Sequence, residues 1–150
     1  MAMNTGKALT GGIIAGIVLN VLDFLWNSVV LADRMKADLD GFKPGMYDAM
    51  NNSTAMWTFI ICDLVIGLIL VWTYAAIRPR FGPGPKTAIT AAFIIWITAG
   101  VVMTNYLTAG MMSMRTWWIV AFLWLVNLIV AGWIGARFYA EDDAPATAAA

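Results

Sequence analysis

The sequence predicts an all-α membrane protein, an antiparallel bundle of four transmembrane helices. Hydrophobic residues make up 61% of the 150 residues and charged residues 12%, against roughly half and a quarter in soluble proteins. The apolar residues form four long segments, 8–32, 55–77, 87–112 and 116–138. Each is close to the roughly 20 residues that a helix needs to cross a bilayer. The sequence lacks the short alternating segments of a transmembrane barrel, so helices are the structure that satisfies the backbone in lipid.

The first segment carries a polar stripe on an otherwise apolar helix. At about 100° per residue, glycines and polar residues recur on one narrow face. They are Gly12, Gly16, Asn20, Asp23 and Asn27. The segment is too long and too polar for a cleaved signal sequence, so we interpret it as a retained first span. Small residues four positions apart are typical of close helix packing, so this face is expected to meet a neighbouring helix.

The longest loop, 33–54, separates the first two spans. Its beginning, 33–38, consists of good helix formers, so the first helix is expected to extend beyond the bilayer. Pro44 and Gly45 then break the helix. We expect Ser53 or Thr54 to cap the second helix.

The second span is expected to end abruptly, because the segment 78–86 is rich in proline and glycine and cannot continue a helix. Pro85 suits the first turn of the third helix. The connection 113–115 is so short that the third and fourth helices must be adjacent and antiparallel. An ungapped match between 57–76 and 117–136 is consistent with two duplicated helical hairpins, although apolar segments match easily by chance.

These boundaries give one transmembrane domain, 1–139, followed by a tail, 140–150, that is expected to be disordered. The basic linker 78–86 flanks two spans closely and contains no acidic residue. Since short cytoplasmic loops are rich in Lys and Arg, this linker predicts that both termini are cytoplasmic. The loop 33–54 then lies on the outer side of a bacterial inner membrane.

Each span contains at least one polar residue on one face, and these are the candidate ligand- or proton-binding residues. They are Asp23, Asp63, Asn20, Asn27, Asn105 and Asn127. At about 1.5 Å per residue, both aspartates lie roughly 12–14 Å below the outer boundary, so the four helices are expected to share one polar layer. No Lys or Arg lies at this depth. Two carboxylates close together without a cation are expected to hold a proton between them.

Two interpretations of this layer stay open. Asn and Asp on facing helices hydrogen-bond membrane bundles together, and Gly12, Gly16 and Gly67 are typical helix-packing residues. The same polar residues also suit a proton or cation path, or a pocket for a ligand with a polar head.

Several function classes are disfavoured by composition. The formal net charge is zero, so no basic face is available for nucleic acid. Histidine is absent, which removes the commonest proton shuttle and metal ligand. The sequence contains no nucleotide-binding, hydrolase or metal-binding motif, so we predict no catalytic residue, cofactor or metal.

The stretches 11–30, with its Phe24-Leu25-Trp26, and 115–136 resemble those of small four-span bacterial integral-membrane proteins of uncharacterised function. The resemblance covers most of the chain. It implies four spans with a longer first outer loop, and it implies no activity.

We therefore expect a non-catalytic accessory or scaffold subunit of a larger membrane complex, embedded in lipid and bound to other subunits or to a second copy of itself. One alternative is a small proton- or cation-linked transporter or ligand-binding bundle that uses the Asp/Asn layer. A second is a lipid-modifying membrane enzyme with an aspartate as general acid or base.

Overall fold

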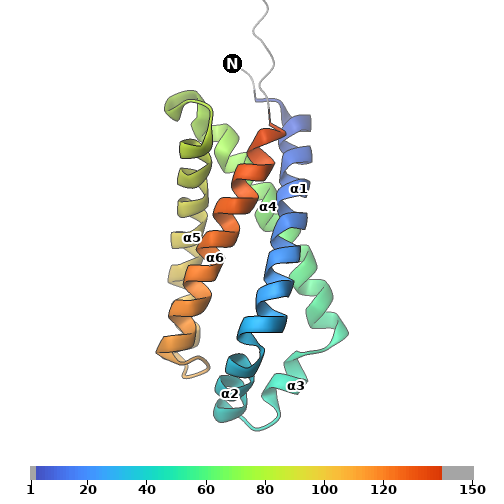
Figure 1. Ribbon diagram of the computed structural model, residues 1–150, viewed down its shortest axis with the longest axis vertical. Helices are drawn as coiled ribbons and strands as arrows, with labels where there is room; N and C mark the ends of the chain where they lie inside the picture. Colours follow the sequence, from blue (N-terminus) through green and yellow to red (C-terminus); the bar gives the residue numbers. More distant parts are fainter. Residues whose placement is uncertain (1–2, 140–150) are drawn as a thin grey trace, which may run out of the picture.

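The computed structural model, which describes residues 3–139, is an antiparallel bundle of four long helices (Figure 1). The long helices are α1 (Thr5–Trp26), α4 (Ser53–Phe81), α5 (Pro85–Thr108) and α6 (Met114–Arg137). The described part contains no strand, and all four helices are long and apolar enough to cross a membrane. The predicted fold class is confirmed. The predicted tail, 140–150, lies outside the described residues.

The first helix is longer than a bilayer requires. It continues from α1 through one π-helical turn, η1 (Asn27–Leu31), into α2 (Ala32–Phe42). The predicted extension beyond the first span is therefore confirmed. A single short turn, α3 (Met46–Met50), follows before α4 begins. We call this side of the bundle the loop end and the opposite side the terminal end.

The π-helical turn changes which side of α2 faces the bundle. One extra residue in a helical turn rotates everything after it by about 100°. Leu31, at the end of this turn, is 4% exposed, and Asp38 reaches the start of α6. There the Asp38 carboxylate accepts hydrogen bonds from the backbone N–H and the hydroxyl of Ser113, both at 3.0 Å. The end of the long first helix is thereby fastened to the start of α6.

The end predicted for the second helix was wrong. The helix α4 continues through Pro79 to Phe81 instead of stopping at Ile77. The fixed φ of proline is compatible with a helix, and its missing N–H removes only one hydrogen bond here, near the helix end. The last turn is closed by Gly82, whose N–H donates to the Arg78 carbonyl at 2.8 Å.

The third helix also ends four residues before the predicted Met112. Gly110 adopts a positive φ of 75°. The N–H of Gly110 donates to the Leu107 carbonyl at 3.1 Å, and the N–H of Met111 donates to the Tyr106 carbonyl at 3.0 Å. This is the double hydrogen bond of a Schellman ending.

The helix starts follow the sequence more closely. Pro85 is the first residue of α5, as predicted. The cap of α4 is Asn52 rather than Ser53 or Thr54, because the Asn52 side chain accepts the Ala55 N–H at 3.0 Å. The helices α5 and α6 pack side by side and run in opposite directions, as the short connection predicts.

Glycines bring α1 against both α4 and α6. A methyl group added at Gly16 would lie 2.6 Å from the Leu64 Cα of α4, and one added at Gly67 would lie 2.6 Å from the Gly12 carbonyl oxygen. On the α6 side, a methyl group at Gly11 would lie 2.6 Å from the Gly135 carbonyl oxygen. These backbones therefore touch directly, which is the packing typical of small residues in membrane helices.

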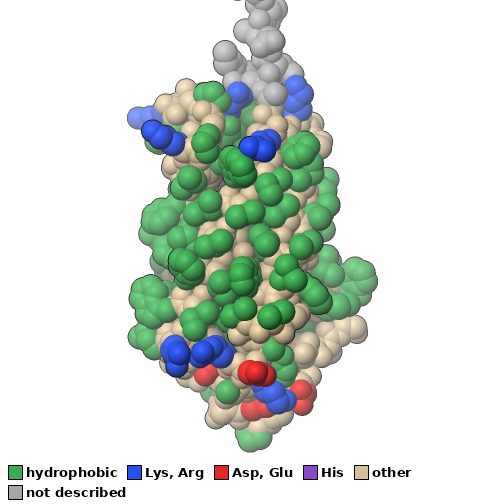
Figure 2. Space-filling model, in the orientation of Figure 1, with side chains coloured by type: hydrophobic (Ala, Val, Ile, Leu, Met, Phe, Trp, Pro, Cys, Tyr) green, Lys and Arg blue, Asp and Glu red, His purple; other side chains and the backbone are tan. Residues whose placement is uncertain are grey.

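The outer surface is apolar between two charged ends (Figure 2). Side chains such as Phe24, Val29 and Val101 are 70–78% exposed. A surface of this kind is the one that faces lipid. Together with the four candidate spans, it identifies the chain as an integral, polytopic membrane protein.

Candidate functional site: a polar network inside the bundle

Three helices contribute polar side chains to one network inside the bundle. We define the polar network as Asn20, Asp23 and Trp26 of α1, Asp63 of α4 and Asn127 of α6. The α1 residues repeat every three residues, which puts them on adjoining faces of that helix. The glycine contacts described above bring the three helices close enough for these side chains to meet.

Asn127 is the centre of the network. It is 1% exposed and uses both ends of its amide. Its Nδ2 donates to Asp23 Oδ1, and its Oδ1 accepts the indole N–H of Trp26 at 2.8 Å. A buried amide with both groups bonded across helices fixes the position of α6 relative to α1.

Asp63 faces Asp23 across the α1–α4 interface. Its side chain is 9% exposed, and its carboxyl group lies within hydrogen-bonding reach of the Asp23 carboxyl group. The sequence prediction that these two aspartates lie at a similar depth agrees with this contact.

Asn20 joins α1 to α4 at the same level. Its Nδ2 donates to the Gly16 carbonyl of its own helix at 3.0 Å and to the Ile60 carbonyl of α4 at 3.2 Å. The amide therefore supports the glycine contact one turn away.

Two of the predicted polar residues do not reach the other helices. Asn27 is exposed, and its Nδ2 donates to the Asp23 carbonyl of the same helix at 2.8 Å. Asn105 is exposed on α5. The expectation that all four helices share the layer was therefore wrong, because three do. Periodicity gave the face of Asn105, but α5 buries only residues between Thr87 and Ala92, near the terminal end.

Trp26 is the network residue that the sequence prediction missed. It lies three positions after Asp23, so the two side chains share one side of a helix. An indole N–H seeks an acceptor when it is buried, and this spacing was the available signal.

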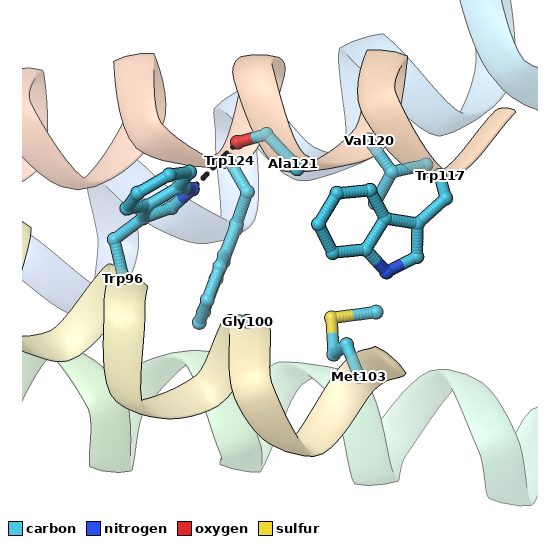
Figure 3. Close-up of a pocket in the computed structure, with 7 residues that line it drawn as sticks. All are labelled: Trp96, Gly100, Met103, Trp117, Val120, Ala121 and Trp124. Atoms are coloured by element: carbon cyan, nitrogen blue, oxygen red, sulfur yellow. Dashed lines mark hydrogen bonds between the residues drawn. The ribbon is translucent and has the colours of Figure 1, made fainter. Parts of the chain in front are cut away.

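Two crevices stand out on the described part of the bundle, and neither contains a residue of the polar network. One lies between α5 and α6 and is lined by aromatic and small side chains (Figure 3). Its lining residues are Trp96, Gly100, Met103, Trp117, Val120, Ala121 and Trp124. The Trp96 indole N–H is already bonded to the Ala121 carbonyl at 2.8 Å. The other lies on α4 beside Trp72.

No family model, no curated protein and no solved structure matches this chain. The resemblance in layout therefore rests on the two sequence stretches alone. What the chain does has to be argued from the geometry of its own residues.

Proposed function

We propose that this polytopic membrane protein is a non-catalytic accessory or scaffold subunit of a larger membrane complex. The observation that carries the proposal is that the buried polar side chains bond to one another across helices. Asn127 uses both ends of its amide in this way, and Asn20 bridges two helices. Polar groups bonded in this manner hold a bundle together.

The two alternatives receive less support from the same geometry. A lipid-modifying enzyme needs a carboxyl group facing a crevice that a substrate can enter. A transporter needs a polar route from the carboxyl groups to the membrane surface. Neither of the crevices described above contains Asp23 or Asp63.

The face most suited to a partner lies on the loop-end half of α5. Only 22% of the spanning window of α5 is buried, against 33% in each of the other three helices. Val101 and Val102 are 70% and 61% exposed, and Asn105 presents an amide beside them. An amide at a membrane-facing position hydrogen-bonds readily to another helix, so we place a helix of the partner subunit there.

The test is purification in mild detergent, followed by identification of the proteins that remain bound. We expect the wild-type protein to travel in a larger assembly. Asn105→Leu should weaken that assembly, while Phe122→Leu, at another exposed position on α6, should not. Migration of the wild-type protein alone would contradict the proposal, and equal effects of the two variants would contradict the α5 face.

We further propose that both termini are cytoplasmic and that the loop 33–54 lies on the outer side of a bacterial inner membrane. The support is the distribution of charge. Within 3–139, the terminal end carries five cationic side chains and no acidic one, and these are Lys7, Arg78, Arg80, Lys86 and Arg137. The loop end carries four Lys or Arg residues together with four aspartates.

A further inference from the structure

The two facing carboxyl groups raise the question of where their charge resides. Asp63 is nine-tenths buried, and the described residues offer its carboxyl group no partner other than Asp23. Two negative charges within hydrogen-bonding reach of each other inside a membrane would repel strongly, and this repulsion would raise the free energy of the folded protein. A hydrogen bond between two carboxyl groups, in contrast, requires a proton on one of them.

The hydrogen bonds of Asn127 indicate which of the two carboxyl groups holds the negative charge. An indole N–H can only donate, so Trp26 fixes the Asn127 oxygen toward itself. The Asn127 NH₂ group must then point to Asp23. Asp23 Oδ1 is therefore an acceptor. This hydrogen bond stabilises the charged form of the Asp23 carboxyl group more than its protonated form, whereas Asp63 receives no such bond from the described residues, so the proton is better held by Asp63.

We propose that the pair holds one proton, that Asp63 carries it, and that Asp23 carries the negative charge. Asp23 then accepts from Asn127 on one side and from the Asp63 carboxyl group on the other. The charge is placed where two donors converge, which is the arrangement that best stabilises a buried carboxylate. The assignment does not depend on what the protein assembles with.

No other charged group within 3–139 competes for this proton. On the helices that pack around the pair, the remaining titratable side chains lie toward the helix ends, except Cys62, which is exposed on α4. These groups are Lys7 on α1, Asp33, Arg34, Lys36, Asp38 and Asp40 on α2, Tyr74, Arg78 and Arg80 on α4, Lys86 and Tyr106 on α5, and Arg115 and Arg137 on α6.

Infrared spectroscopy of the full-length protein in lipid tests the assignment, using isotope-labelled aspartate to identify the carboxylic C=O band. At neutral pH, we expect one protonated aspartate in the wild-type protein. Asp63→Asn should lose the band completely, because the new amide still donates to a charged Asp23. Asp23→Asn should keep a band at a shifted frequency, because Asp63 then has no charged acceptor.

Asp38→Asn, at the loop end, is the matched control and should leave the band unchanged. Asp63→Ser keeps a donor in a smaller side chain and should also lose the band, so the test stands if one Asp63 variant fails to fold. A band that survives both Asp63 variants and disappears in Asp23→Asn would place the proton on Asp23. Absence of a band in the wild-type protein, or a band twice as strong as in Asp23→Asn, would overturn the single shared proton.

Discussion

Asn127 shows what the sequence could and could not predict about single residues. Its helix and its face followed from periodicity, as did those of Asp23 and Asp63. Its partners did not, because they lie about one hundred residues away and depend on how three helices are rotated. The tryptophan that orients its amide was missed for the same reason.

Asn127→Leu should reduce the free energy of unfolding by about 1–3 kcal/mol. An interhelical hydrogen bond in a membrane contributes on average about 0.6 kcal/mol. Two are lost here, and the partly buried Trp26 N–H and Asp23 carboxyl group also lose a partner. Reversible unfolding in mixed micelles measures the change.

The control for this change is Asn105→Leu, which makes the same replacement at an exposed position of α5. It should alter the stability of the isolated protein by less than about 0.5 kcal/mol. Equal losses in both variants would show that the Asn127 hydrogen bonds do not stabilise the fold.

Helices are the scale at which the sequence was most informative about packing. The spacing of Gly12 and Gly16 predicted a contact face on the first helix, and the structure places this face against α4. The π-helical turn was not predictable, because its register satisfies two distant partners at once. Trp26 must reach Asn127 before the turn, and Asp38 must reach Ser113 after it.

Gly67→Ala should destabilise the protein by about 1–3 kcal/mol, the range for overpacking a tight interface. The added methyl group would meet the backbone of Gly12 and Gly16, and backbone atoms cannot move aside as a flexible side chain can. The unfolding measurement used for Asn127 applies here too.

Gly100→Ala provides a matched control, since it adds the same methyl group to a helix where no atom lies within 4 Å. There the gain in helix propensity is at most about 1 kcal/mol, so stability should be unchanged or slightly higher. If Gly67→Ala were equally neutral, the α1 and α4 backbones would not be in direct contact.

At the scale of the whole molecule, the bilayer constrains the sequence so strongly that the fold can be predicted from it. A spanning helix must be long and apolar, so four such segments predicted four helices and their antiparallel order. The helix ends were harder, because a cap or a glycine turn depends on a few atoms. Proline near the end of α4 was tolerated where a stop was expected, and Gly110 ended α5 early.

The orientation of the whole bundle follows from its two unlike ends, and thiol labelling in intact cells measures it. Gly41→Cys lies at the loop end, where no atom would crowd an added side chain, and Pro83→Cys lies at the terminal end. Both are made with Cys62→Ser, so that each protein has one thiol. A reagent that cannot cross the membrane should label position 41 and leave position 83 unlabelled until the cells are broken.

Both cysteines replace uncharged residues, so neither changes the charge difference that is expected to set the orientation. A stricter test of the orientation changes the charge difference between the two ends of the bundle. Changing Arg78, Arg80 and Lys86 to glutamine removes three of the five cations at the terminal end and leaves the loop end as it is. Position 83 should then become accessible in a fraction of the molecules. Labelling of position 83, but not of position 41, in otherwise wild-type protein would show that the bundle is inserted the other way round.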